Sequence, residues 1–376
     1  MENSRVRAAT GEVQQTDIAV VGAGPAGLTA AIEAARAGAR VTLVDENSRP
    51  GGQLVKQIHK FFGSKDHRAG IRGIHIGQDL LAEADAAGVD VALNTVAYGL
   101  YDGMRIGLVC NGRSFALQAR AIILATGASE RVVPFDGWTL PGVMGAGAIQ
   151  TLMNTHRTLP GRRVLIVGAG NVGLIVAYQI LQAGAEVVAI VDGLPYIGGY
   201  GVHASKVRRA GVCILVSHTL LSVKGSEDVE QATIVAVDDD WEPVTGTEKT
   251  LDVDTVGLAV GLTPLAELAW IAGCRFEYVA ELGGHTPVHD CNMETTLPGI
   301  FVAGDAAGVE EASTAMEEGR LAGLAVAERL GYLQEADAER KKDEVRTRLS
   351  MLRLGSFGEE RAMAKTRILE ARDKWQ

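Results

Sequence analysis

The pattern of apolar positions repeats in two distant parts of the chain. The segment 18–45 reads IAVVGAGPAGLTAAIEAARAGARVTLVD, and the segment 164–192 reads VLIVGAGNVGLIVAYQILQAGAEVVAIVD. Each begins with a short apolar run, passes through a G-x-G-x-x-G turn, continues in a nearly uncharged stretch of helical length and ends in a second apolar run closed by an aspartate. This pattern predicts a strand–turn–helix–strand unit of the dinucleotide-binding type in each segment.

Three glycines and an aspartate carry the chemistry of the first segment. Gly22 permits a tight turn out of the strand, and Gly27 lets the helix pack closely on that strand. Because Gly24 has no Cβ, a pyrophosphate can reach the backbone N–H groups at the helix N-terminus, where the helix dipole favours an anion. Asp45 is placed to accept hydrogen bonds from ribose hydroxyls. The second segment repeats this set at Gly168, Gly170, Gly173 and Asp192.

Three more apolar runs complete the pattern. The run 121–128 (AIILATGA) predicts a strand ending in a turn of small residues, and the run 255–263 (TVGLAVGLT) is its weaker counterpart after the second repeat. The run 297–308 (LPGIFVAGDAAG) predicts a strand that ends at a Gly-Asp pair, followed by a helix from about residue 311 to 331. Glycine- and proline-rich stretches at 133–147 and 261–263 mark the crossings between the two repeats.

We therefore expect an α/β protein with two Rossmann-like dinucleotide-binding domains, the second inserted in the first, and a C-terminal helical tail. The expected parts are a flexible leader at 1–16, a first domain at 17–140 and 265–331, a second domain at 141–264 and the tail at 332–376.

The charge balance excludes one large class of function. The 376 residues include 46 acidic and 36 basic side chains, which gives a net charge of −10. A nucleic-acid binder needs a dominant basic surface, so we expect no nucleic-acid partner.

The longest uncharged run, 164–185, contains Asn171, Gln179 and Gln182, and we interpret it as a buried strand–turn–helix. With no apolar signal core at the polar N-terminus, we expect a cytoplasmic protein without a transmembrane segment.

Cysteine and histidine spacing disfavours a metal or dithiol site. No pair among the four cysteines has C-x-x-C spacing, and we expect buried free thiols at Cys110, Cys213, Cys274 and Cys291. His285 and His289 have a spacing that metal ligands can have, but Pro287 between them disfavours presentation on a helix. We expect no metal site.

Four short motifs resemble those of the two-dinucleotide-binding-domain flavoproteins, the thioredoxin-reductase-like group. They are GAGPAG at 22–27, GGQL at 51–54, ATG at 125–127 and GD at 304–305. The stretch 125–154 is most similar to the α subunits of amine and imino-acid dehydrogenases. That subgroup comprises hydrogen cyanide synthase, opine oxidase, hydroxyproline and proline dehydrogenases, and the matching part of sarcosine oxidase.

The resemblance implies that FAD lies along the first domain. Asp45 then holds the ribose, the GGQL turn passes the isoalloxazine side, Val96 edges the adenine and Asp305 bonds the ribityl chain. The helix after Glu311 directs its N-terminus at the N1/O2 edge of the flavin. The implied FAD-binding residues are Gly22, Gly24, Pro25, Ala26, Gly27, Asp45, Glu46, Gly52, Gln53, Leu54, Val96, Ala125, Thr126, Gly127, Gly304, Asp305 and Ser313.

The same resemblance assigns a nicotinamide dinucleotide to the second domain. Asp192, with no arginine between it and Arg208, favours NAD over NADP, since a 2′-phosphate would meet a carboxylate. The implied NAD-binding residues are Gly168, Gly170, Asn171, Val172, Gly173, Asp192 and Gly261.

The chain also differs in three respects from the proteins that it resembles. It has neither the C-x-x-C of thioredoxin reductases nor a cysteine pair after the GG turn, which excludes dithiol–disulfide exchange. Where opine-oxidase-like α subunits continue into a cysteine-rich [2Fe–2S] region, this chain has a charged tail, so an iron–sulfur relay must come from another chain. Some relatives hold a nicotinamide dinucleotide or ATP in the first site, which leaves an alternative occupant there.

Three charged stretches are candidates for surface features, and two of them have two interpretations. The basic run 56–72 is either a docking surface for an acidic partner or anionic substrate, or a solvated amphipathic helix. Glu317, Glu318 and Arg320 are most simply a surface charge cluster. In the tail, apolar positions at Val345, Leu349 and Leu352, before a second helix that ends at Trp375, predict a stripe that covers either its own domain or a partner subunit.

The leading functional prediction is an FAD-dependent, NAD-linked oxidoreductase, the α-type subunit of a multi-subunit amine or imino-acid dehydrogenase. Its expected partners are a flavin-containing β-type subunit, a small iron–sulfur protein and a small amine or imino-acid substrate. The alternatives are a standalone NADH-dependent reductase of a quinone or ferredoxin-like acceptor and a non-catalytic nucleotide-binding scaffold. The sequence assigns no catalytic acid or base.

Overall fold

The computed structural model describes residues 13–61, 64–355 and 358–374. The chain forms two compact units, one made of residues 1–129 with 263–376 and the other of residues 130–262. Two strands, β9 (Ala128–Glu130) and β18 (Leu262–Pro264), carry the chain from one unit to the other and pair with each other. The first crossing therefore comes before the stretch 133–147 that we expected to mark it.

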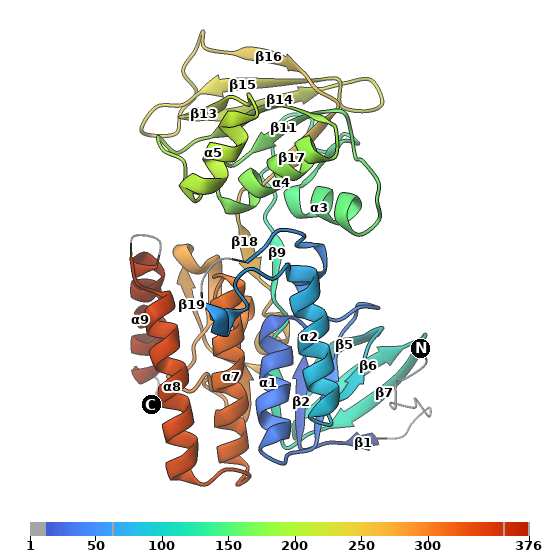
Figure 1. Ribbon diagram of the computed structural model, residues 1–376, viewed down its shortest axis with the longest axis vertical. Helices are drawn as coiled ribbons and strands as arrows, with labels where there is room; N and C mark the ends of the chain where they lie inside the picture. The colour runs from blue at the N-terminus through green and yellow to red at the C-terminus, as the bar shows by residue number, and fades with distance from the viewer. Residues whose placement is uncertain (1–12, 62–63, 356–357, 375–376) are drawn as a thin grey trace. The chain divides into compact units, whose positions relative to one another are not determined.

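The larger unit is built on a five-stranded parallel sheet of order β21-β8-β2-β3-β4 (Figure 1). The strands span Ile300–Val302, Ala121–Leu124, Ile18–Val21, Val41–Val44 and Asp90–Ala92. Strands β8, β2 and β3 are buried at every position, because residues of the helices and of a second sheet of this unit share one hydrophobic core with them. The helices of this unit include α1 (Pro25–Arg36), α2 (Gly73–Ala86) and α7 (Ala312–Arg329).

Glycine allows α1 and α7 to pack closely. A Cβ at Gly319 would lie 2.1 Å from the carbonyl oxygen of Ala26, and one at Gly323 would lie 2.4 Å from that of Ala30. Any larger residue at these two positions would push α7 away from the helix that begins at the first glycine turn.

A second sheet in the larger unit has the order β1-β7-β6-β5. Its strands span Val13–Gln15, Arg113–Gln118, Arg105–Cys110 and Thr95–Tyr101. The expectation of a flexible leader over 1–16 is wrong for Val13–Gln15, because these residues pair with β7. The rest of the leader, residues 1–12, lies outside the described residues.

The smaller unit repeats the parallel arrangement with the order β10-β17-β11-β12-β13. These strands span Val143–Gly145, Thr255–Leu258, Arg163–Val167, Glu186–Asp192 and Ile214–Val216. Its helices are α3 (Ala146–Asn154), α4 (Asn171–Gln182) and α5 (Gly201–Arg209), and an antiparallel sheet joins β14 (His218–Lys224), β15 (Gln231–Ala236) and β16 (Lys249–Asp252). The uncharged run 164–185 is a strand, turn and helix, as predicted.

Within the described parts of the chain, no helix is at once long and apolar enough to cross a bilayer.

The tail forms two helices, α8 (Glu335–Leu352) and α9 (Glu359–Asp373), and α8 lies beside α7 (Figure 1). Val345 and Leu349 are buried in the main core of the larger unit. In α9, Ala364 and Ile368 pack with residues of β19 (Phe276–Val279) and of the 3-10 turn η3 (Ala280–Leu282). The apolar stripe therefore covers its own unit. Trp375, the expected end of the second helix, lies outside the described residues.

Candidate functional site

The three glycines of the first turn differ in what surrounds them. A Cβ at Gly22, whose φ is +105°, would lie 2.2 Å from the carbonyl oxygen of Ala125, and a Cβ at Gly27 would lie 1.8 Å from that of Gly22. At Gly24 the nearest atom would be the Cα of Gly52 at 4.0 Å. Packing therefore requires glycine at the first and third positions, whereas the second faces open space of the kind that a ligand can fill.

The N-terminus of α1 is available to an anion. Gly24 is its N-cap and no side chain caps it. Pro25 at the first helical position has no N–H, which leaves the N–H groups of Ala26 and Gly27 as donors in the first turn. A pyrophosphate fits this arrangement, because it accepts hydrogen bonds and carries the charge that the helix dipole favours.

The second turn reproduces the first. A Cβ at Gly168, with φ +109°, would lie 2.3 Å from the carbonyl oxygen of Ala259, and one at Gly173 would lie 2.0 Å from that of Gly168. A Cβ at Gly170 would meet nothing within 4 Å. Asn171, the first residue of α4, accepts a 2.8 Å hydrogen bond from the backbone of Tyr200. Its side chain thus holds a neighbouring loop, while Val172 is exposed.

The two aspartates hold their glycine turns in the same way. Asp45 Oδ2 accepts a hydrogen bond of 2.6 Å from the backbone N–H of Ala23. Asp192 Oδ2 accepts one of the same length from Ala169. Asn47 donates two further hydrogen bonds to Asp45 Oδ1, at 2.7 and 2.9 Å, and Leu194 donates one to Asp192 Oδ1 at 2.9 Å. Since each carboxylate oxygen has two lone pairs, acceptor capacity for ribose hydroxyls remains on Oδ2 of Asp45 and on both oxygens of Asp192.

The GGQL turn is packed against the first glycine turn. Gly51 donates to the carbonyl of Ala23 at 2.6 Å, and a Cβ at Gly52 would lie 2.9 Å from the Cα of Gly24. In the 3-10 turn η1 (Gly52–Lys56), Gln53 is exposed, whereas Leu54 is completely buried. Gln53 is thus free to meet a ligand, and the side chain of Leu54 belongs to the core.

Other candidates lie around the same sheet edge. The carbonyl of Asp45 accepts a 2.9 Å hydrogen bond from Thr95, which places the exposed Val96 next to the aspartate. Thr126 donates its hydroxyl to the carbonyl of Leu265, so this side chain fixes the chain at the return to the larger unit. The other candidates include exposed Glu46, buried Ala125, and Gly127 and Gly261 with positive φ.

Asp305 lies in the 3-10 turn η4 (Gly304–Ala307), directly before α7. Its Oδ1 accepts a 3.3 Å hydrogen bond from the backbone of Glu310. Burial is the largest cause that raises its pKa to about 6, and the nearby Glu318 and Glu310 carboxylates add to the effect. At the start of α7, Glu311 and Thr314 form a reciprocal capping box, and Ser313 lies between them.

The prediction that Glu317, Glu318 and Arg320 form a surface charge cluster is wrong for the two glutamates. Glu317 and Glu318 are 0% and 2% exposed. Glu317 bonds His67 Nε2 at 3.1 Å and Arg348 Nε at 3.0 Å, and it also pairs with Arg320. Burial acts to raise the pKa of Glu317, but its hydrogen bond to His67 and the two arginines outweigh burial and lower it. Sequence spacing showed only the local Glu317–Arg320 pair, because the other partners come from distant segments.

In its described residues, 56–61 and 64–72, the basic run forms no α-helix, which is contrary to the amphipathic-helix interpretation. It contains the end of η1 and the short turn η2 (Lys65–His67). His67 is buried, and Arg68 pairs with Glu83 on α2. Lys60 and Lys65 are exposed, so the docking surface stays a prediction.

The histidines and cysteines do not form a cluster. His285 is exposed on β20 (Gly284–Pro287), whereas His289 is buried, and burial lowers its pKa to about 3. No group of three or more histidine, cysteine or acidic side chains in the described residues could hold a metal ion. All four cysteines are free, but the expectation that they are buried holds only for Cys274, because Cys110 is partly buried and Cys213 and Cys291 are exposed.

Comparison with known proteins identifies the family. The family model described as pyridine nucleotide-disulphide oxidoreductase matches residues 16–319. The chain belongs to this family. Membership confirms the predicted class, a flavin-dependent oxidoreductase, and the family binds FAD and usually NAD(P).

Curated relatives of this family member include components of larger enzymes. One subunit of opine oxidase from Agrobacterium tumefaciens (strain Ach5) is 33% identical over 82% of this chain and 65% of that protein. The alpha chain of sarcosine oxidase from Rhizobium meliloti (strain 1021) is 33% identical over 84% of this chain and 31% of that protein. The HcnB component of hydrogen cyanide synthase from Pseudomonas aeruginosa is 28% identical over 91% of this chain and 77% of that protein. The chain thus spans less than two thirds of the opine oxidase relative and about one third of the sarcosine oxidase relative.

Solved structures share the fold. T. acidophilum thioredoxin reductase matches with a TM-score of 0.69 and 20% identity, over 84% of this chain and 99% of that chain. L-proline dehydrogenase from P. horikoshii matches with a TM-score of 0.65 and 22% identity, over 90% of this chain and 61% of that chain. The predicted α/β class with Rossmann-type units and a helical tail is confirmed.

Proposed function

We propose that the larger unit binds FAD, that the smaller unit binds NAD, and that the chain is the α-type subunit of a multi-subunit amine or imino-acid dehydrogenase. One observation carries the cofactor assignment, and it holds for both glycine turns. Backbone atoms leave no room for a Cβ at the first and third glycines, whereas the second glycine faces open space. In each turn an aspartate carboxylate accepts a hydrogen bond from the backbone N–H next to that second glycine. That arrangement suits a dinucleotide pyrophosphate and its ribose. The names of the relatives, which are oxidase and synthase subunits, support the subunit role.

In the larger unit, the residues bind and orient the cofactor. The first turn of α1 donates N–H groups to the pyrophosphate, Asp45 accepts from the ribose, and Asp305 accepts from the ribityl hydroxyls. Bound FAD supplies hydride and electron transfer, which amino-acid side chains do not provide. We assign no residue as general acid or base.

In the smaller unit, Asp192 selects between the two nicotinamide dinucleotides. Its carboxylate suits the free 2′-hydroxyl of NAD and would repel the 2′-phosphate of NADP. The N-terminus of α4 at Gly170 takes the pyrophosphate, as the open space at that position allows.

Electrons leave through partner chains in this proposal. The described residues bring together no cysteine cluster, and in this proposal an iron–sulfur relay comes from a small separate protein. A β-type subunit that contains flavin acts on a small amine or imino acid. Free thiols suit the reducing cytoplasm, where we place the protein.

Absorbance of the purified chain tests the cofactor assignment. We expect a flavin spectrum, with FAD as the nucleotide released by denaturation, and only slow bleaching by NADH until partner chains are added. Rapid bleaching by NADH without a partner would favour a standalone reductase. A chain that retains no flavin and binds none when FAD is added would contradict the proposal and favour a nucleotide-binding scaffold.

A further inference from the structure

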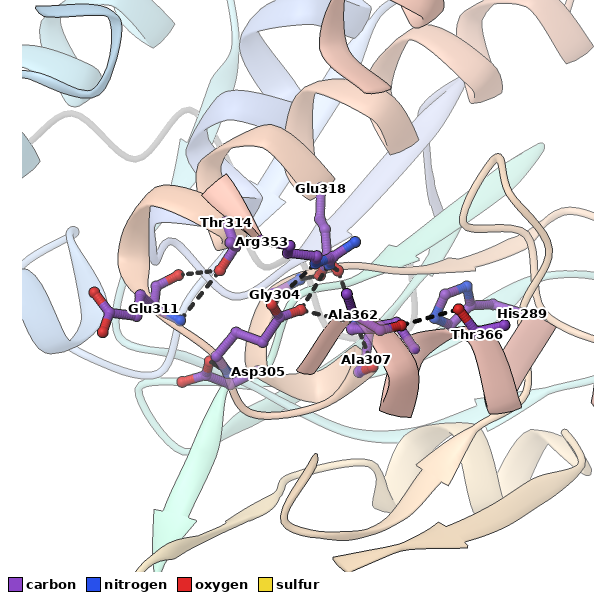
Figure 2. A network of polar contacts seen from close by, with 12 residues as sticks. His289, Gly304, Asp305, Ala307, Glu311, Thr314, Glu318, Arg353, Ala362 and Thr366 are labelled. Carbon is purple, nitrogen blue, oxygen red and sulfur yellow. Dashed lines mark hydrogen bonds and ion pairs between the residues drawn. The ribbon is translucent and has the colours of Figure 1, made fainter. Parts of the chain in front are cut away.

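The turn η4 is tied at both ends to buried charged side chains (Figure 2). The N–H of Gly304, its first residue, donates to Glu318 Oε2 at 3.0 Å. The carbonyl of Ala307, its last residue, accepts from Lys365 Nζ at 2.7 Å. Asp305 lies between these two bonds, so a shift of either end would move its carboxylate.

The side chains that hold η4 also hold each other. Arg353 Nη2 lies 2.7 Å from Glu318 Oε1 (Figure 2). Lys365 Nζ lies 2.7 Å from the same oxygen. Arg353 also bonds Glu310 Oε1 at 2.6 Å. The side chains of Lys365, Glu318 and Glu310 are at most 5% exposed. Two cations thus balance two carboxylates, and removal of one member leaves a buried charge uncompensated.

The same cluster sets the electrostatic environment of Asp305. Burial and the carboxylates of Glu318 and Glu310 raise the pKa of Asp305 to about 6. The backbone N–H of Glu310 and the ammonium of Lys365 oppose this rise. Without Lys365, the negative charges around Asp305 would be opposed less, and its pKa would rise further.

Two more groups face this cluster. His289 is neutral above about pH 3, because burial, Lys365 and Arg353 lower its pKa. Burial acts to lower the pKa of Arg353, but Glu318 and Glu310 raise it overall, so Arg353 stays charged. Neither group changes its charge near neutral pH, whereas Asp305 does.

We propose that Lys365 and Arg353, supplied by the C-terminal tail, are positioning residues for the cofactor of the larger unit. Lys365 holds the last carbonyl of η4, and Arg353 holds Glu318, which holds the first N–H. Together they present Asp305 to the ribityl hydroxyls as an ionised carboxylate. This inference rests on the proposed binding of FAD in the larger unit, and it extends that proposal by making the tail part of the cofactor site.

The geometry explains why the tail is needed for this task. Lys365 lies on α9, and Arg353 directly follows α8. Glu318 and Glu310 lie in or just before α7, so the core of the unit supplies carboxylates around η4 and the tail supplies the cations. Buried carboxylates that face one another without cations would repel each other and favour protonation.

A matched pair of substitutions, Lys365→Met and Lys342→Met, tests the proposal. Lys342 on α8 is equally buried and lies 2.6 Å from Glu328 and 2.7 Å from Glu339, away from η4. Both variants should lower the melting temperature of the full chain to a similar extent, since each breaks a buried ion pair. FAD binding to the deflavinated protein, followed by flavin fluorescence from about pH 5 to 8, should change only in Lys365→Met.

We expect Lys365→Met to weaken FAD binding at least about threefold at pH 7. The acid limb of the pH profile, where FAD affinity falls as Asp305 is protonated, should move upward by about half to one pH unit. A purely structural role for Lys365 would lower stability without moving that limb. Arg353→Met should likewise weaken FAD binding, and Arg353→Lys, which keeps the positive charge, should restore part of the affinity.

The double variant Glu318→Gln/Lys365→Met keeps the test decisive if the single variant does not fold. It removes one charge of each sign and leaves an amide oxygen to accept from Gly304. Its acid limb should return towards that of the wild type, because one group that raises the pKa of Asp305 and one that lowers it are both absent. Its FAD affinity should stay reduced, since the carbonyl of Ala307 has lost its donor.

Two negative results would have different meanings. If the folded Lys365→Met and Lys342→Met proteins bind FAD alike at every pH, the positioning role of the tail is wrong. For the double variant, wild-type affinity together with a wild-type acid limb would lead to the same conclusion. If the wild-type chain binds no FAD at any pH, the proposed function itself is wrong.

Discussion

The backbone N–H of Ala23 donates a 2.6 Å hydrogen bond to the carboxylate of Asp45, so the residue expected to hold the ribose also fixes the turn expected to hold the pyrophosphate. Ala169 and Asp192 form the same bond, with the same length, in the smaller unit. Each aspartate is therefore a candidate to bind the ribose and also stabilises its glycine turn. Its replacement should affect dinucleotide binding through both contributions.

We predict that Asp192→Ala weakens NADH binding about tenfold or more, and NADPH binding less. The substitution removes the acceptor for the ribose hydroxyls, but it also removes the carboxylate that repels a 2′-phosphate. Loss of the bond to Ala169 should affect both dinucleotides alike. Titrating each dinucleotide against the wild type and the variant measures the difference, and Asp45→Ala in the other unit is the control for general damage. Equal losses for both dinucleotides would exclude the ribose role.

The open space at Gly24 leads to a second prediction. Gly24→Val should abolish flavin retention and leave the chain folded, because a Cβ there meets only the Cα of Gly52 at 4.0 Å but lies where the pyrophosphate is expected. Gly27→Val is the contrast, since its Cβ would lie 1.8 Å from the carbonyl oxygen of Gly22 and should unfold the unit. Circular dichroism and flavin absorbance separate the two effects. A folded Gly24→Val protein with full flavin content would contradict the assignment of the first site.

The sequence predicted the parts of the fold that local pattern determines. Both glycine turns, with their flanking strands and helices, follow from apolar periodicity and from glycines at fixed spacing. The strand Val13–Gln15 was not predicted, because its pairing partner Arg113–Gln118 lies about 100 residues further along the chain and gives no local signal.

The charged network was predicted incorrectly for the same physical reason. Glu317 and Arg320 are three residues apart on a helix, which is typical of an exposed ion pair. The burial of Glu317 depends on His67, about 250 residues earlier, and on Arg348 in the tail. The only local sign was that these charges stand among alanines and glycines in α7, a helix that the core surrounds.

Buried Glu317 should make the stability of the protein depend on pH. Its pKa in the folded state is lowered, so its ionised form stabilises the fold above about pH 4.5, the ordinary value for a glutamate. That stabilisation should be lost as the pH falls below this value. Glu317→Gln should therefore cost about 2–4 kcal/mol at pH 7 and less at low pH, because it leaves the half-buried guanidinium groups of Arg320 and Arg348 without their counter-charge.

Urea unfolding between about pH 3 and 7 measures this effect. Glu344→Gln is the control, since the exposed pair of Glu344 with Arg340 on α8 should contribute about 0.5 kcal/mol or less. A Glu317→Gln protein with the same pH dependence of stability as the wild type would show that folding does not lower the pKa of this carboxyl group.

Asp305 should strengthen FAD binding but lower the free energy of unfolding of the protein without FAD. Its pKa is raised to about 6 from 3.8, so ionisation of the folded protein opposes folding above about pH 6. This cost should fall as the pH is lowered from about 6 towards 3.8. Asp305→Asn should thus stabilise the protein without FAD by about 1–2 kcal/mol at pH 7, a value reduced because the residue is only partly buried, while it weakens FAD binding. Unfolding free energies with and without FAD test both signs together, and a loss of stability in the absence of FAD would contradict the assignment.

The last prediction concerns the exposed lysines of the basic run. Electrons that leave the flavin in this proposal need a docked acceptor, and Lys60 and Lys65 follow the GGQL turn, which the resemblance places beside the ring. Opposite charges raise the rate of encounter, and salt suppresses the effect because exposed charges are screened over about 8–10 Å at physiological ionic strength. Lys60→Gln/Lys65→Gln should therefore slow electron transfer to an acidic acceptor at low salt and flatten the dependence of the rate on ionic strength, with flavin content unchanged. Lys224→Gln/Lys249→Gln, exposed in the smaller unit, changes the net charge equally and should leave the slope close to that of the wild type. Equal slopes for both double variants in a stopped-flow salt series would show that the basic run does not steer the acceptor.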